Sequence, residues 1–269
     1  EKLAKELMEH QAKRAMTPGH AFSKIDEDYI SFEDAFPFDE TLDQLRAIKE
    51  IMSDMNQPKA MDRLLCGDVG FGKTEVAMRA AYRSILDGKQ VAWLVPTTVL
   101  AHQHYRSLVE RFSDFAANIC ILDRSVTSAS KILEKLKKGE IDILIGTHRI
   151  LSKDIDFRDL GLLIVDEEQR FGVLQKEKIK SMSYGVDVLT MTATPIPRTL
   201  QMAMVGLRDL SLLTTPPKSR LATKTFVCPF EESIIIESIQ FELNRGGQVF
   251  YVHNRVEELN SVYEYLHKI

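Results

Sequence analysis

A glycine-rich segment of the sequence has the spacing of a phosphate-binding loop. Residues 67–74 read GDVGFGKT, which fits the pattern G-x-x-x-x-G-K-[ST]. Glycines at these spacings let backbone N–H groups converge on a phosphate, and the following helix adds the positive end of its dipole. We therefore predict a nucleotide site in which Lys73 reaches the β- and γ-phosphates and the Thr74 hydroxyl binds Mg²⁺. The loop residues predicted to hold the nucleotide are Gly67, Asp68, Val69, Gly70, Phe71, Gly72, Lys73 and Thr74.

A pair of acidic residues follows an apolar run later in the chain. Asp166 and Glu167 come directly after Leu162–Val165, and the carboxyl end of a strand in a doubly wound sheet faces the ligand crevice. We predict that Asp166 holds Mg²⁺ through water and that Glu167 orients and deprotonates the attacking water. An acid pair at a strand end is otherwise a common solvated cap, so this interpretation depends on the loop upstream. The predicted catalytic residues are thus Lys73, Asp166 and Glu167, and the predicted metal ligands are Thr74 and Asp166.

The segment Phe38–Gln44 could recognise the base of the nucleotide. Thr41 and Gln44 have the spacing of a capping box, in which each side chain binds the other residue's backbone N–H at the start of a helix. Gln44 could also hydrogen-bond the edge of adenine while Phe38 packs on its ring. The two roles are compatible, and we expect both.

Three further strand ends carry side chains that could bind a nucleic-acid backbone. Hydroxyl groups, amides and basic side chains at such corners bind phosphate, and contacts of that kind carry no base code. Ordinary helix caps, or a turn set by Pro195 and Pro197, are the alternative explanations. The candidate residues are Thr97, Thr98, Gln103, Thr147, His148, Arg149, Thr192, Thr194 and Arg198.

The elements that position these residues alternate between strand and helix. Short, wholly apolar runs separated by helical patterns indicate a parallel sheet that is covered on both faces. We therefore predict an α/β fold with a doubly wound, mostly parallel sheet. The predicted strands are Arg63–Cys66, Val91–Val95, Ile119–Leu122, Ile141–Ile145, Leu162–Val165 and Val188–Met191. The predicted helices are Thr74–Leu86, Val99–Phe112, Ser128–Lys138 and Val173–Met182.

The alternating pattern breaks at Thr214–Leu221, where two prolines interrupt it. The elements predicted beyond the break are a strand at Thr223–Val227, a helix near Ser233–Asn244, a strand at Gln248–Val252 and a last helix to Ile269. They fit the start of a second α/β domain with too few residues to complete it. The predicted domains are therefore a helical lead-in at residues 1–35, a nucleotide-binding domain at 36–214, and a linker with an incomplete second domain at 215–269. Since the first residue is Glu, we also expect a segment of a longer protein.

Composition narrows the class of protein. The 269 residues are 44% hydrophobic and 28% charged with a formal charge of −4, so any contact with nucleic acid must be local. Cys66, Cys120 and Cys228 lack metal-ligand spacing and are typical of reduced thiols in a cytoplasmic protein. No apolar run approaches the roughly 18 residues of a membrane helix, so we expect no membrane partner.

Taken in order, these motifs resemble those of superfamily 2 helicases. The similarity is greatest to the translocase module of bacterial transcription-repair coupling factors, and RecG-like branch-migration helicases are near relatives. The segments that carry the resemblance are Phe38–Gln44 (Q motif), GDVGFGKT (motif I), PTTVLAHQH at 96–104 (motif Ia), GTHRIL at 146–151, DEEQ at 166–169 (motif II), TATPIPRT at 192–199 (motif III) and RGGQVFYVHNRVE at 245–257.

The resemblance implies a RecA-like P-loop NTPase domain followed by the start of a second one, with ATP and Mg²⁺ as cofactors. It also implies an ATP-dependent translocase on double-stranded DNA that displaces stalled RNA polymerase and promotes nucleotide excision repair. Its polymerase and excision-repair partners would bind through modules absent from this chain. Motif III, which contains Thr192, Thr194 and Arg198, would link hydrolysis to the surface that faces DNA.

The sequence departs from the family pattern in two respects. Gln169 stands where these relatives usually have His, and either side chain can hydrogen-bond toward the γ-phosphate or motif III. Motifs V and VI are not in this sequence, and motif VI carries an arginine finger worth roughly 10³ to 10⁵ in rate in related NTPases. We therefore expect the chain to bind ATP but to hydrolyse it slowly alone. The alternatives are a RecG-like branched-DNA helicase and a fragment that only binds nucleotide and DNA. A P-loop small-molecule kinase would need an acceptor site and a lid, whereas this sequence offers motifs Ia and III, so we reject that interpretation.

Overall fold

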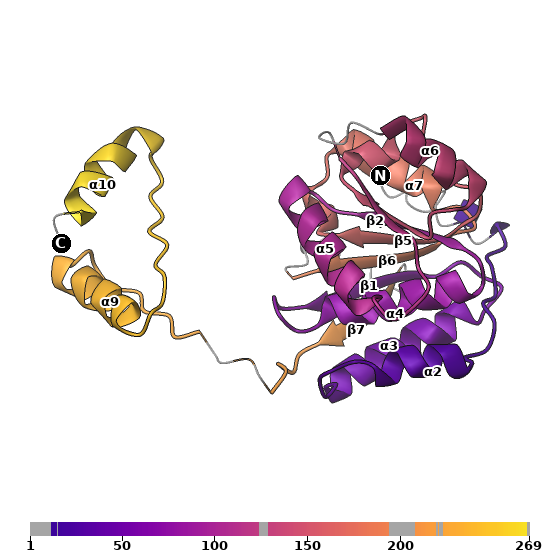
Figure 1. Cartoon of the computed structure of the whole chain (residues 1–269), viewed down its shortest axis with the longest axis horizontal. Coiled ribbons are helices and arrows are strands. Elements are labelled where there is room, and N and C mark those ends of the chain that lie inside the picture. The colour runs from indigo at the N-terminus through magenta and orange to yellow at the C-terminus, as the bar shows by residue number, and fades with distance from the viewer. Residues whose placement is uncertain are drawn as a thin grey trace. The chain divides into compact units, whose positions relative to one another are not determined.

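The computed structural model describes residues 12–14, 16–123, 129–193, 208–218, 220 and 223–267. The chain divides into two compact units, Glu1–Arg220 and Leu221–Ile269, and each is considered by itself (Figure 1). Residues 215–220, which we assigned to the linker, lie in the first of these units. Within the described residues, no helix combines the length and the apolar character needed to cross a bilayer.

The first unit is built on a seven-stranded sheet in which every neighbouring pair of strands is parallel (Figure 1). Its order is β3-β4-β2-β5-β6-β1-β7. The strands are β1 (Asp62–Gly67), β2 (Gln90–Leu94), β3 (Ile119–Leu122), β4 (Ile143–Gly146), β5 (Leu160–Asp166), β6 (Asp187–Thr192) and β7 (Asp209–Leu213). The predicted α/β fold and all six predicted strands are confirmed, whereas β7 is an additional strand that the sequence analysis missed.

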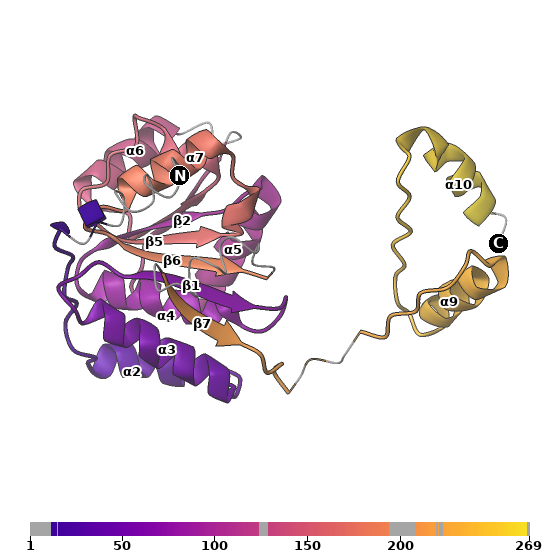
Figure 2. The same cartoon turned by 180° about the vertical axis from the view of Figure 1, so that it is seen from behind.

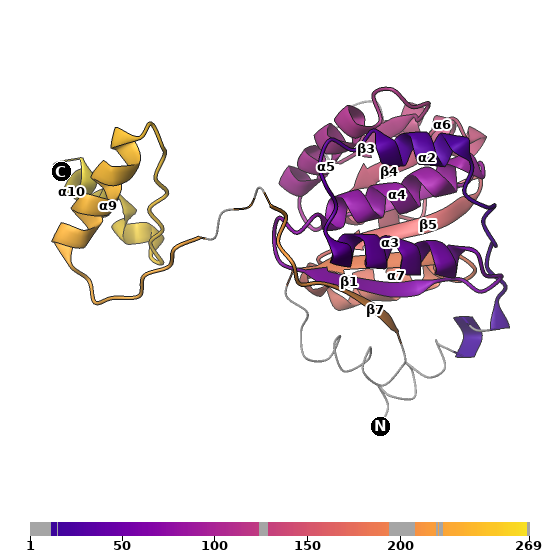
Figure 3. The ribbon, with the colours of Figure 1, turned by 90° about the horizontal axis from the view of Figure 1, so that it is seen from below.

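Helices cover both faces of this sheet (Figures 2 and 3). On β5, Leu162 and Ile164 join the core beneath one set of helices, while Leu163 and Val165 join the core beneath the other. This alternation follows from the period of two along a strand. The first set is α2 (Glu27–Asp34), α3 (Leu42–Met55), α4 (Lys73–Leu86) and α5 (Thr98–Arg111), and the second is α6 (Ala129–Lys138) and α7 (Val173–Met182).

Helix α2 belongs to the core of the first unit. The Asp26 carboxylate caps it by accepting the N–H of Tyr29 at 2.9 Å. Phe32 is fully buried and stacks on Tyr82 of α4, with 4.3 Å between ring centroids. Because α2 buries the rings of Tyr29 and Phe32 in the same core as α4, it stabilises the face of the sheet that α4 covers.

The second unit contains α9 (Glu232–Asn244), a 3₁₀ turn at Val256–Glu258 and α10 (Leu259–Leu266). The two predicted strands, Thr223–Val227 and Gln248–Val252, are wrong: neither pairs with another segment in the described residues 223–267. A strand is stabilised by hydrogen bonds to neighbouring strands and by a packed face, and both are missing here. The side chains of Val227 and Phe250 are accordingly exposed.

Candidate functional site

The glycine-rich loop connects β1 to α4 and has the backbone that its glycines allow. Gly70 and Gly72 both have φ of +79°, in the left-handed region that other residues rarely adopt. A Cβ on Gly72 would lie 2.3 Å from the side-chain amide nitrogen of Gln44, and one on Gly67 would lie 2.7 Å from Cβ of Leu213. Glycine is therefore favoured at Gly70 and Gly72 by their backbone conformation and at Gly67 by the close approach of Leu213, as a backbone cradle for phosphate requires.

The side chain of Lys73 folds back onto the carbonyl groups of this loop. Its Nζ donates to the carbonyl oxygens of Gly67 at 2.6 Å and Asp68 at 3.0 Å. Burial lowers the pKa of the Lys73 ammonium group, while the nearby carboxylates of Asp166 and Glu167 act in the opposite direction. This ammonium group could exchange its hydrogen bonds to the carbonyl oxygens for stronger, charge-assisted hydrogen bonds to a phosphate.

The acidic residues at the end of β5 are held from two sides. The Oδ2 atom of Asp166 lies 3.0 Å from Nε2 of His104, a residue of α5. The Oε1 atom of Glu167 accepts the N–H of Ala193 at 3.0 Å, and its other oxygen lies 3.4 Å from the Thr192 hydroxyl. The end of β6 thus fixes the carboxylate that we expect to activate water.

Glu167 also has an unusual backbone. Its φ of 50° and ψ of 52° make it the one non-glycine residue with positive φ in the described part of the chain. Strain of this kind persists where surrounding contacts over-determine a functional residue. Gln169 follows on a 3₁₀ turn and donates its side-chain N–H to the Glu167 carboxylate, and the Thr192 hydroxyl is 3.4 Å from its Oε1. Motifs II and III are therefore joined through side chains.

The donor set around the loop fits a metal–nucleotide complex. Among the described residues, no cluster of three or more histidine, cysteine or acidic side chains forms a cage for a resident ion. Mg²⁺ at nucleotide sites is usually held by one or two protein groups, with phosphate oxygens and water completing the shell. Asp166 and Thr74, beside a cradle for phosphates, offer that kind of partial donor set.

A pocket of about 530 Å³ adjoins the loop on the Q-motif side. Gln44 forms the predicted capping box: its Oε1 accepts the N–H of Thr41 at 2.8 Å, and its Nε2 donates to the carbonyl of Phe71 at 2.9 Å. Each amide atom retains one further hydrogen-bonding position, which matches the donor and acceptor on the N6/N7 edge of adenine. Phe38 also lines the pocket and is 64% exposed, so its ring face is available for stacking.

The segment after β7 forms another wall of this pocket, which the sequence analysis did not anticipate. Pro217 and Lys218 line it, and Arg220 lies over the Phe71 ring at 4.8 Å while pairing with Asp68 at 3.0 Å. The whole segment is anchored at Asp43, whose Oδ2 accepts the backbone and hydroxyl groups of both Thr214 and Thr215. These hydrogen bonds hold the pKa of Asp43 well below its usual range.

The sheet brings the candidate DNA contacts to the same edge as the acidic residues. Strands β4, β2, β5 and β6 are successive neighbours, so their carboxyl ends lie side by side. At the end of β2, Thr97 caps α5 by accepting the N–H of Leu100, while Thr98 and Gln103 are exposed. These residues have the accessibility that phosphate contacts require.

The segments that follow β4 and β6 differ from the segment that follows β2. Thr147 is buried, His148 is exposed, and Arg149 forms a bidentate pair with Asp154 at 2.7 and 2.6 Å. Thr192 is buried among the motif II side chains, and the predicted contacts Thr194 and Arg198 lie outside the described residues. The structure therefore presents Thr98, Gln103 and His148 outward and turns Thr147 and Thr192 inward.

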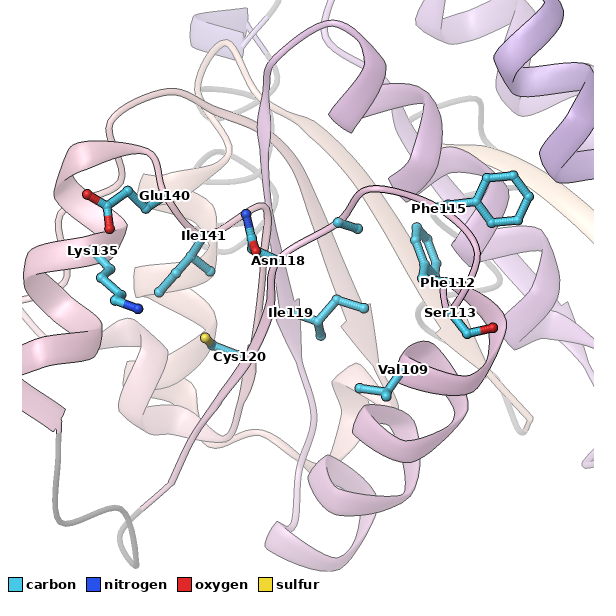
Figure 4. Close-up of a pocket in the computed structure, with 11 residues that line it drawn as sticks. Val109, Phe112, Ser113, Phe115, Asn118, Ile119, Cys120, Lys135, Glu140 and Ile141 are labelled. Carbon is cyan, nitrogen blue, oxygen red and sulfur yellow. The ribbon is translucent and has the colours of Figure 1, made fainter.

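A separate pocket of about 400 Å³ lies at the β3 edge of the sheet. In Figure 4, one wall of this pocket is formed by α5 and the loop that follows it, which contribute Val109, Phe112 and Phe115. Lys135 of α6 lies on the opposite side, and Ile119 of β3 lies between the two walls. None of the residues predicted for the site lines this pocket. The chemistry suggested by the sequence is thus concentrated at the carboxyl ends of the central strands.

Known proteins are similar to this sequence over most of its length. The chain is 56% identical to the transcription-repair-coupling factor of Bacillus subtilis over 259 residues, which are 96% of this chain and 22% of that protein. It is 54% identical to the protein of that name in Escherichia coli over 98% of this chain and 23% of the relative. The chain therefore spans less than a quarter of the length of these relatives.

Solved structures and a family model agree with this similarity. RecG bound to a three-way DNA junction matches with a TM-score of 0.79 and 37% identity, covering 99% of this chain and 35% of that one. The DEAD-box helicase Mss116 shares the fold, with a TM-score of 0.55, 16% identity, and coverage of 72% of this chain and 44% of that one. The model that matches residues 41–203 describes the DEAD/DEAH box helicases. The predicted resemblance is confirmed, and the chain belongs to the DEAD/DEAH box helicase family.

Proposed function

We propose that the chain is the ATP-binding part of an ATP-dependent translocase that moves on double-stranded DNA and couples transcription to repair. The observation that carries the proposal is that Lys73 lies close enough to Asp166 and Glu167 to feel both charges, in a loop whose Gly70 and Gly72 have the positive φ of a phosphate cradle. The 56% identity to a transcription-repair-coupling factor supports the choice among helicase activities. A cytoplasmic location is part of the same proposal, since the relatives are bacterial coupling factors.

The proposed chemistry assigns a task to each side chain. Lys73 and the loop N–H groups neutralise the β- and γ-phosphates, and Gln44 with Phe38 binds adenine. Glu167 would accept a proton from the attacking water, and Asp166 and Thr74 would hold Mg²⁺, which would supply charge stabilisation of the transferred phosphoryl group. The backbone N–H of Ala193 keeps the Glu167 carboxylate in position through the 3.0 Å hydrogen bond already described.

Motion would arise because motif II and motif III share these side chains. The Thr192 hydroxyl lies 3.4 Å from both Glu167 and Gln169, so a change at the γ-phosphate position reaches the end of β6 directly. Thr98, Gln103 and His148 would grip the phosphate backbone, together with Thr97, Arg149, Thr194 and Arg198. RNA polymerase and excision-repair proteins would bind through other parts of a longer protein.

A second candidate is a helicase on branched DNA. It is favoured by the 0.79 TM-score to RecG bound to a three-way junction, but the sequence identity of 37% is lower than that to the coupling factors. The choice can be made by comparing ATP hydrolysis of the longer protein on linear duplex and on a three-way junction of equal length. Equal stimulation supports the translocase, and strong preference for the junction supports the branched-DNA helicase.

The proposed hydrolysis is tested with Glu167→Gln in the longer protein that contains this chain. We expect DNA-stimulated hydrolysis to fall by about 10²-fold or more, because the group that accepts the proton is lost, while ATP affinity stays within about threefold. Glu177→Gln, on the neighbouring helix α7, serves as the control. Hydrolysis at the parent rate in Glu167→Gln would reject the assigned role.

A further inference from the structure

A buried histidine joins the helix of motif Ia to the acidic end of β5. His104 and Asp166 are each only 8% exposed, and Nε2 of the imidazole lies 3.0 Å from Oδ2 of the carboxylate. The functional assignments above use Asp166 but give His104 no role. Because burying two polar side chains is costly, the pairing of His104 with a predicted metal ligand suggests a role for His104 beyond packing.

The chemistry of the pair fixes which atom carries the proton. An ionised carboxylate has only acceptor positions, so Nε2 of His104 must donate to Oδ2 of Asp166. That hydrogen bond restricts rotation of the carboxylate about its Cβ–Cγ bond and withdraws Oδ2 from competition for other donors. Asp166 is thereby held in one orientation before any ligand arrives.

The imidazole itself is held by its surroundings. The Trp93 ring of β2 lies 5.3 Å away between centroids and is tilted by 43°. Trp93 is fully buried, and its strand pairs with β5 in a register that places it opposite Ile164, two residues before Asp166. The imidazole ring therefore packs against β2, the strand next to the one that carries the carboxylate.

We propose that His104 is the positioning residue for Asp166, which it orients so that the carboxylate can take its place in the Mg²⁺–nucleotide complex. The inference rests on the proposed function, because it concerns the metal that accompanies the nucleotide. Residues that orient a metal-binding side chain typically contribute 10- to 100-fold to metal affinity. A residue that only filled space would affect folding and would leave metal binding unchanged in a folded variant.

The 269-residue chain provides the test and its own matched control. His102 lies on the same helix and pairs with the buried Asp123 at 3.0 Å, yet Asp123 has no assigned role at the metal. The variants are His104→Leu, which removes the donor, His104→Gln, whose amide N–H can replace it, and His102→Leu. Two quantities are measured for each: ADP affinity in EDTA, and Mn²⁺ affinity in the presence of ADP, followed by the electron paramagnetic resonance signal of free Mn²⁺.

We expect His104→Leu to weaken Mn²⁺ binding by about 10- to 100-fold while ADP affinity in EDTA stays within about twofold. His104→Gln should recover most of the loss, and His102→Leu should resemble the parent. Parent-like Mn²⁺ affinity in a folded His104→Leu, or equal losses in the Leu and Gln variants, overturns the inference. If His104→Leu does not fold, His104→Asn replaces it: its amide is too short to reach Oδ2, so Mn²⁺ affinity equal to that of His104→Gln overturns the inference.

The same measurements separate this inference from the proposed function. A parent chain that binds no ADP, with or without metal, contradicts the nucleotide site itself. A parent that binds ADP and Mn²⁺, with variants that do the same, contradicts the role of His104 alone.

Discussion

Replacement of Asp187 by Asn should make the stability of the protein much less dependent on pH. Asp187 begins β6, is 2% exposed, and accepts the N–H of Met61 at 2.7 Å through Oδ1, while no hydrogen-bond partner from the described residues reaches its Oδ2. Burial raises the pKa of this carboxyl to about 7 from its ordinary 3.8, although the Met61 N–H and Arg14 act in the opposite direction. The folded state therefore holds the proton more tightly than the unfolded state does.

The sign and size of the effect follow from that difference. Because the folded pKa is the higher one, the free energy of unfolding falls as pH rises from about 4 to about 7, where the folded state would have to ionise a buried group. At 1.36 kcal/mol per pH unit, the total cost approaches about 4 kcal/mol, of which about 2 to 3 kcal/mol appears between pH 5 and pH 8. The Asn side chain retains the oxygen that accepts the Met61 N–H and carries no charge. The contribution of this site to the pH dependence of the free energy of unfolding should therefore vanish in Asp187→Asn.

Urea unfolding at pH 5, 6, 7 and 8 measures this prediction. The free energy of unfolding of Asp187→Asn should rise relative to the parent by about 2 to 3 kcal/mol between pH 5 and pH 8, whatever the constant cost of burying an amide. Asp114→Asn, at an exposed acidic residue, is the control and should follow the parent. Parallel pH profiles for Asp187→Asn and the parent would refute the reasoning.

Three other substitutions test separate parts of the structure. Gln44→Ala should weaken ATP binding by about tenfold, the worth of one to two hydrogen bonds, and leave GTP binding unchanged in competition with a fluorescent nucleotide; an equal loss for both nucleotides would contradict base recognition. Thr192→Ala in the longer protein should preserve most DNA-stimulated ATP hydrolysis while reducing translocation measured by triplex displacement, and unchanged coupling would count against motif III. Arg79→Met should lower the free energy of unfolding by about 3 to 5 kcal/mol in urea, because the fully buried Arg79 guanidinium pairs with three carboxylates; a loss below about 1 kcal/mol would show that these pairs contribute little.

The sequence predicted the parts of the fold that depend on local pattern. Mostly apolar runs of four or five residues identified six of the seven strands, because strands buried on both faces carry mostly apolar side chains. The short edge strand Asp209–Leu213 alternates between exposed and buried residues and lacks that signal. The two strands expected in residues 223–252 failed for the opposite reason: their composition favours extended structure, but a strand forms only beside a partner.

The candidate site also contains some features that the sequence predicted and others that it did not. The loop at Gly67–Thr74 and the acids after β5 are contiguous in sequence, and their spacing indicated both. His104 was placed correctly on a helix, with Ala101 and Leu108 at helical spacing on its buried face, but its contact with Asp166 joins elements far apart in the sequence. The left-handed backbone of Glu167 and the wall formed by Pro217 and Lys218 likewise depend on tertiary packing. Such contacts leave no periodic trace in a single sequence.

The most direct test of the nucleotide site is the affinity of the chain for ATP and Mg²⁺, measured by isothermal titration calorimetry with Lys73→Ala. The Lys73 ammonium is the one cation hydrogen-bonded to the loop carbonyls in the described residues. Loss of a charge-assisted hydrogen bond should weaken binding by about 10- to 100-fold, with Lys178→Ala, at an exposed lysine of α7, retaining parent affinity. Equal affinity in Lys73→Ala and the parent would contradict the assignment of this loop as the phosphate site.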